Sequence, residues 1–118
     1  MYKRQFLGYA DETGTGAGQG ANLNLPLPRG TDYAAWAAAL DHALQAIGAY
    51  GAQALVVSLG VDTFEGDPIS GFTLASDDYL RVGERLQRAG LPTVMVFEGG
   101  YAVEPIGVNA VNVVQAFA

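Results

Sequence analysis

The sequence has no cysteine, and it has only one histidine, His42. Without cysteine, the chain has no disulfide framework and no thiolate metal site. No apolar run approaches the ~20 residues that a membrane-spanning helix needs. Residues 1–5 lead into no apolar segment of the kind found in signal peptides. We therefore expect a cytoplasmic protein that does not bind membranes.

Charged residues are also scarce, at 15% of the chain against about 25% in ordinary soluble domains. This low share indicates a buried sheet or a surface that further chain covers. Twelve acidic and six basic residues give a net charge of −6, which argues against nucleic acids and anionic membranes as partners. The charge is compatible with a cationic substrate, although ordinary acidic solubility explains it more simply. With 118 residues, half of them hydrophobic, the chain suits one domain or part of one.

Three segments have the patterns of β-strands. Residues 22–25 alternate polar and apolar side chains, and prolines end the segment. Residues 54–59 and 93–97 are continuous apolar runs, the pattern of strands in a sheet covered on both faces. The glycine-rich residues 6–20 are expected to form a loop. Residues 16–21 fit G-x-G-x-x-A, but this is a weak dinucleotide signal because no strong strand precedes them and no helix follows.

Three other segments have the helical spacing of apolar residues, with a start signal before each and a glycine after the first two. The predicted helices are residues 33–50 capped by Thr31 or Asp32, 77–89 capped by Ser76, and 105–116 beginning at Pro105, and the two glycines are Gly51 and Gly90. The alternation of strands and helices predicts an α/β fold, a parallel sheet with flanking helices.

Polar side chains follow both apolar strands. Asp62 comes shortly after residues 54–59, and Tyr101 comes shortly after residues 93–97. In parallel α/β sheets, ligands and chemistry collect at the carboxyl ends of the strands. A carboxylate and a phenol at this edge predict a metal ligand and an oxyanion donor. From spacing alone, a cap or turn role for Asp62 and a core role for Tyr101 stay open.

Several segments resemble the C-terminal part of the arginase-fold zinc deacetylases, the histone deacetylase superfamily. They occur in the family's order, and they are most similar to the bacterial acetylpolyamine amidohydrolase branch. The segments are GYADETGTGAG (8–18) with NLNLPLP (22–28), VSLGVDTFEGDP (57–68), EGGY (98–101), and IGVN (106–109) with VNV (111–113). The resemblance implies that residues 6–118 are the C-terminal part of a single deacetylase domain with a three-layer α/β fold. Residues 1–5 do not fit it and resemble a non-native adaptor sequence.

The resemblance also implies roles for individual residues. Asp62 is similar in place to the family's carboxylate zinc ligand, and Tyr101 to its catalytic hydrogen-bond donor. Among the neighbouring residues, Gly99, Gly100 and Phe64 are implied to contact substrate, and Glu98 to be a hydrogen-bond partner behind the site. Core packing of Phe64 and a surface position for Glu98 stay open. Asp67 is expected to be a turn residue, and His42 a solvated helix residue.

The implied activity is that of a zinc-dependent amidohydrolase that removes acetyl groups from small acetylated amines such as acetylpolyamines. The cofactor is one zinc ion (Zn2+) per intact site, and K+ binding and a homo-oligomer are implied for the intact enzyme. The chain alone is expected to be inactive, because it lacks the family's Asp-x-His segment and its His pair. The alternatives are a non-catalytic remnant that acts as an interaction module, and one half of a split deacetylase.

Overall fold

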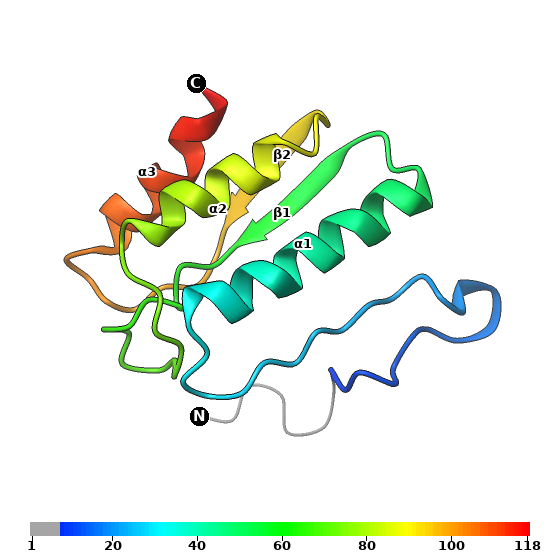
Figure 1. Cartoon of the computed structure of the whole chain (residues 1–118), viewed down its shortest axis with the longest axis horizontal. Helices are drawn as coiled ribbons and strands as arrows, with labels where there is room; N and C mark the ends of the chain where they lie inside the picture. Colours follow the sequence, from blue (N-terminus) through cyan, green and yellow to red (C-terminus); the bar gives the residue numbers. More distant parts are fainter. Residues whose placement is uncertain (1–7) are drawn as a thin grey trace.

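The computed structural model describes residues 8–118 (Figure 1). The prediction for residues 1–5 lies outside this range. Within it the chain forms two strands, three α-helices and two short 3-10 helices. In chain order these are η1 (Gly16–Gly18), α1 (Tyr33–Tyr50), β1 (Leu55–Leu59), α2 (Asp78–Gln87), β2 (Thr93–Phe97), α3 (Ile106–Val114) and η2 (Gln115–Phe117).

The two strands form a parallel pair, as the sequence predicts. Leu55 lies opposite Thr93 at one end and Leu59 lies opposite Phe97 at the other, so the strands end in register. The segment that connects them contains α2, which is the crossover that a parallel pair requires. Because the two strands end together, the loops that follow them begin at the same edge of the sheet.

The third predicted strand, residues 22–25, is wrong. These residues pair with no strand in the described part of the chain, and asparagine side chains brace the neighbouring loop instead. The amide of Asn24 donates to the carbonyl of Tyr9 at 2.9 Å, and that of Asn22 donates to the carbonyl of Glu12. Such bonds from side chain to backbone offer the chain an alternative to a sheet ladder. Residues 16–18 form only a 3-10 turn within this loop, so the arrangement needed for a dinucleotide site is not present among residues 8–30.

Helix α1 begins and ends where the sequence predicts. The Asp32 carboxylate accepts the N–H of Ala35 at 2.9 Å, and Gly51 ends the helix with a φ of +79°. The predicted cap of α2 is wrong, because Ser76 does not cap this helix. The carboxylate of Asp78 instead accepts the N–H of Ala75 at 2.8 Å, which stabilises the turn before the helix. The third helix matches its prediction, with its last residues tightened into η2.

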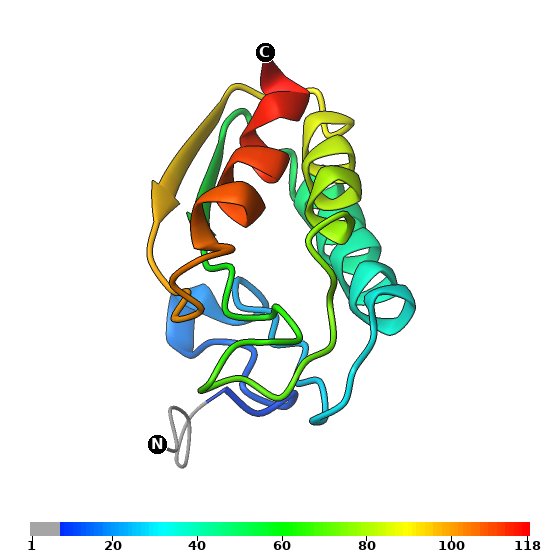
Figure 2. The same cartoon turned by 90° about the vertical axis from the view of Figure 1, so that its left-hand side faces the viewer.

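All three α-helices lie on one side of the sheet (Figure 2). The side chains along β1 therefore alternate between that side and the open side, where Val56 is 71% exposed. Val94 and Val96 of β2 are also exposed. No helix of residues 8–118 lies on this second face, so the described part of the chain does not itself provide the cover that the strand pattern predicts there. None of the helices in residues 8–118 could span a lipid bilayer.

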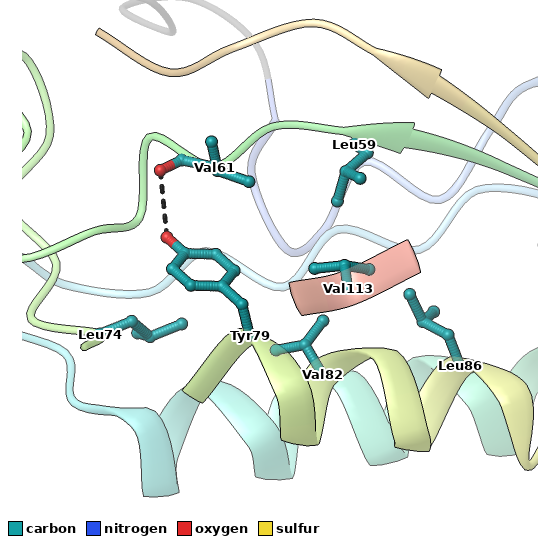
Figure 3. Packing of buried hydrophobic residues seen from close by; sticks show 7 residues of the cluster. All are labelled: Leu59, Val61, Leu74, Tyr79, Val82, Leu86 and Val113. Atoms are coloured by element: carbon teal, nitrogen blue, oxygen red, sulfur yellow. Dashed lines mark hydrogen bonds between the residues drawn. The ribbon is translucent and has the colours of Figure 1, made fainter. Parts of the chain in front are cut away.

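The core lies between the sheet and helices α2 and α3 (Figure 3). It contains the predicted apolar face of α2, and its buried members are Leu59, Val61, Leu74, Tyr79, Val82, Leu86 and Val113. Val61 and Leu74 belong to loops rather than to strands or helices, and both are almost completely buried. The loop that carries Asp62 is therefore anchored in the core immediately before that residue.

Candidate functional site

The loops that follow β1 and β2 lie side by side and are joined by backbone hydrogen bonds. The N–H of Glu98 donates to the carbonyl of Leu59 at 3.0 Å, and the N–H of Val61 donates to the carbonyl of Gly99 at 2.7 Å. The parallel pairing of the strands thus continues into the two loops. Asp62 follows directly on one loop, and Tyr101 follows two residues later on the other. The structure brings together the two segments from which the site is predicted.

Two glycines lie against the carboxylate of Asp62. A Cβ atom on Gly99 would lie 2.7 Å from Oδ2 of Asp62, and one on Gly60 would lie 3.1 Å from Oδ1. Any larger residue at position 99 would displace this carboxylate. Gly100 has a φ of +145°, and a Cβ there would meet Val61. Gly60 and Gly99 therefore shape the seat of Asp62, whereas Gly100 lies against Val61. Contact of Gly99 and Gly100 with a substrate stays a prediction.

A buried tyrosine is hydrogen-bonded to the residues on both sides of Asp62. The Tyr79 hydroxyl donates to the carbonyl of Val61 at 3.0 Å (Figure 3) and lies 2.9 Å from Oγ1 of Thr63. Burial raises the pKa of Tyr79, which outweighs the opposing effect of the Thr63 hydrogen bond. The hydroxyl consequently stays protonated and remains a donor. Helical spacing puts Tyr79 on the buried face of α2, but it does not reveal where the hydroxyl points, so this role is not predictable from the sequence.

Asp67 is a turn residue, as predicted, and it also reaches the second loop. Its Oδ1 accepts the N–H groups of Ile69 at 2.9 Å and Ser70 at 3.1 Å. Its Oδ2 accepts the N–H of Tyr101 at 2.8 Å. The side chain is 7% exposed, and its three backbone donors compensate for the burial of its charge. The link to Tyr101 spans 34 positions, so no local pattern in the sequence reveals it.

The other predicted site residues differ in exposure. Phe64 is half-buried and packs against the core cluster, which favours core packing over an open channel wall. Glu98 is exposed, and its backbone rather than its side chain joins the two loops. The Tyr101 side chain is 40% exposed, as a group that meets a substrate needs to be. His42 is exposed on α1, in agreement with the prediction of a solvated helix residue.

The residues present fit one position of a zinc site. A catalytic zinc ion usually has three protein ligands, and carboxylate oxygen is one of the ligand types it accepts. Asp62 provides such an oxygen at the predicted edge of the sheet. Among the described side chains, no three histidine or carboxylate groups are grouped closely enough to hold a metal ion. Residues 8–118 therefore form no metal site by themselves, and the role of Asp62 as a zinc ligand stays a prediction.

Comparison with known proteins identifies close relatives in sequence. The sequence profile of the histone deacetylase domain matches residues 5–117. The chain is 62% identical over 112 residues to acetylpolyamine amidohydrolase 2 of Pseudomonas aeruginosa, and 54% identical over 113 residues to the acetylpolyamine amidohydrolase of Mycoplana ramosa. These matches cover 95% and 96% of this chain but only 33% of each relative. The chain thus spans about a third of the length of these relatives.

Solved structures share the fold. The crystal structure of acetylpolyamine aminohydrolase from Burkholderia pseudomallei matches with a TM-score of 0.91 and 39% sequence identity. The match covers 95% of this chain and 33% of that chain. The histone deacetylase Clr3 matches with a TM-score of 0.82 and 26% identity. The predicted fold class, part of a deacetylase-like α/β fold, is confirmed.

Proposed function

Since the chain belongs to the histone deacetylase domain family, we propose that it is the C-terminal part of a zinc-dependent deacetylase that acts on small acetylated amines. One observation carries this proposal: Asp62 and Tyr101 follow two paired strand ends within a chain that is 62% identical to an acetylpolyamine amidohydrolase. Acetylpolyamines are accordingly the substrates proposed, and the net charge of −6 suits the cationic amines of such substrates.

In this proposal Asp62 is a metal ligand. Its carboxylate lies against Gly99 and Gly60, and Tyr79 fixes the residues on either side of it. A ligand that cannot move far keeps the geometry that a metal ion requires. A zinc ion held by this carboxylate and by further ligands would supply Lewis-acid chemistry and activate water for attack.

Tyr101 is proposed as the donor to the oxyanion that forms when an amide carbonyl is attacked. A hydroxyl stabilises this oxyanion best when it is held in place before the reaction, because no energy is then spent on reorienting it. Removing one such donor lowers kcat by about 10²–10³-fold. The exposed phenol of Tyr101, at the same edge of the sheet as Asp62, suits this role.

The isolated chain is expected to be inactive, since the other zinc ligands and the His pair of the family are not among its residues. An interaction module is the second candidate, and the exposed apolar face formed by Val56, Val94 and Val96 is the observation that favours it. A split deacetylase is the third. Mixing this chain with a separate polypeptide that carries the remaining two-thirds of the domain distinguishes the third candidate, because activity then appears only in the mixture.

A chimeric enzyme tests the proposed function. In it, residues 6–118 replace the matching third of the P. aeruginosa acetylpolyamine amidohydrolase 2, and zinc content and hydrolysis of acetylpolyamines are measured. We expect the chimera to be active, Asp62→Asn to lose zinc and activity together, and Tyr101→Phe to keep zinc while kcat falls by about 10²–10³-fold. Asp77→Asn and Tyr50→Phe, both at exposed positions, are the matched controls and should change neither quantity. Near-normal turnover by Tyr101→Phe would show that the Tyr101 hydroxyl is not the oxyanion donor.

A further inference from the structure

We infer that Asp67 is a positioning residue for Tyr101, which it holds through the Tyr101 backbone. The inference rests on the proposed function, because it assigns Asp67 to the same site. A turn needs only one carboxylate oxygen, and Oδ1 of Asp67 already serves Ile69 and Ser70. The second oxygen, Oδ2, is directed instead at the N–H of Tyr101, 2.8 Å away.

The chain that leads into Tyr101 needs such an anchor. Gly99 and Gly100 precede it, and two successive glycines have no side chains with which to restrain the backbone. The N–H of Tyr101, at the first position after these glycines, donates a hydrogen bond to the Asp67 carboxylate. Its acceptor is charged and 7% exposed, which makes this bond stronger and less accessible to water than an ordinary surface hydrogen bond.

The anchor also joins the two halves of the site. Asp67 lies on the loop that carries Asp62, whereas Tyr101 lies on the loop after β2. The phenol oxygen is at the far end of the Tyr101 side chain, so a small rotation of the backbone moves it by a larger distance. A misplacement of about 1 Å can reduce a reaction rate by about 10²-fold. Asp67 therefore sets where the oxyanion donor stands relative to the metal ligand.

Hydrogen exchange in the 118-residue chain tests the anchor without any need for activity. Asp67→Ala removes both acceptors, and Asp67→Asn keeps the side-chain volume but has one oxygen in place of two. In Asp67→Ala we expect the Tyr101 amide to exchange about 10–100-fold faster than in the unchanged chain. In Asp67→Asn we expect the turn amides of Ile69 and Ser70 to keep the single oxygen, so that only the Tyr101 amide accelerates. Unchanged exchange at Tyr101 in both variants would overturn the inference.

Kinetics in the chimera tests the consequence for catalysis. Both Asp67 variants should lower kcat by about 10–100-fold, less than Tyr101→Phe, while KM and zinc content stay unchanged. Asp32→Ala is the matched control, since it removes a carboxylate that caps α1 far along the chain from the site. It should lower the melting temperature and leave kcat as it is. A kcat that stays within twofold, despite faster exchange at Tyr101, would show that the anchor is structural only.

The two experiments separate the failure of this inference from the failure of the proposed function. If the unsubstituted chimera does not hydrolyse acetylpolyamines, the proposed function is wrong, and the exchange rates still decide whether Asp67 restrains Tyr101. If the chimera is active and the Asp67 variants match it in kcat, the proposed function stands and the positioning role is wrong.

Discussion

Gly99 is the position where the geometry makes the sharpest prediction about the metal ligand. In Gly99→Ala the new Cβ would lie 2.7 Å from Oδ2 of Asp62 and 3.0 Å from its Cγ. An ordinary van der Waals contact is about 3.4 Å or longer, so the distance between the new Cβ and Oδ2 has to increase by about 0.7 Å. The Gly99 backbone is held by the 2.7 Å bond from the Val61 N–H. The movable partner is therefore the carboxylate of Asp62.

A displacement of this size exceeds what a metal site tolerates. Distances between metal and ligand stay within about 0.2 Å of their normal values in sound sites. Loss of correct ligand orientation typically reduces metal affinity by about 10–100-fold, or ~1.4–2.8 kcal/mol. We expect Gly99→Ala to reduce zinc affinity in the chimera by this factor, with Tyr101 and its anchor intact.

Competition with a chelator of known affinity measures the change. Gly48→Ala is the matched control, because an added Cβ at this position of α1 meets no atom within 4 Å. It should leave zinc affinity unchanged and should raise the free energy of unfolding by about 0.5–1 kcal/mol, as alanine restricts the unfolded chain and favours the helix. Equal zinc affinities for Gly99→Ala and the unsubstituted chimera would refute the assignment of Asp62 or the seat described for it.

Three further predictions concern the supports of the site. Tyr79→Phe keeps the ring but leaves the Val61 carbonyl without this donor, and urea unfolding should show a loss of about 1–3 kcal/mol. Leu74→Ala empties a position that is 0% exposed and should cost about 2–5 kcal/mol, whereas Val103→Ala, at 84% exposed, should stay within about 0.5 kcal/mol. In a double-mutant cycle on kcat/KM, Gly99→Ala and Asp67→Ala should deviate from additivity by more than ~0.5 kcal/mol, and strict additivity would contradict a coupled site.

Local signals in the sequence were sufficient for the helices and the two apolar strands. Helix α1 begins after Asp32 and ends at Gly51, because a cap and a left-handed glycine act on the residues next to them. The same local reasoning fails at residues 22–25, where asparagine side chains bind a loop ten and fifteen positions earlier. It also fails at Ser76, because Asp78 stabilises the turn in its place.

In the candidate site, too, local sequence signals predict some residues and not others. Asp62 and Tyr101 are predictable, since each follows an apolar run whose carboxyl end has to lie at one edge of a parallel sheet. The supports of these residues are not predictable in this way. Tyr79 acts on Val61 and Thr63 from 18 and 16 positions away, through a hydroxyl whose direction the periodicity does not define. Sequence pattern thus locates the proposed ligand and the proposed donor, and only the folded chain shows what restrains them.

The two loops restrain each other reciprocally. Asp67, on the loop of Asp62, holds the backbone of Tyr101, and Gly99, on the loop of Tyr101, forms the wall against which the Asp62 carboxylate lies. Neither the proposed ligand nor the proposed donor is therefore positioned by its own loop alone. A metal ligand and an oxyanion donor must keep a fixed separation to act on one carbonyl group. Reciprocal bracing sets that separation through contacts made within this third of the domain, whatever the remaining ligands contribute.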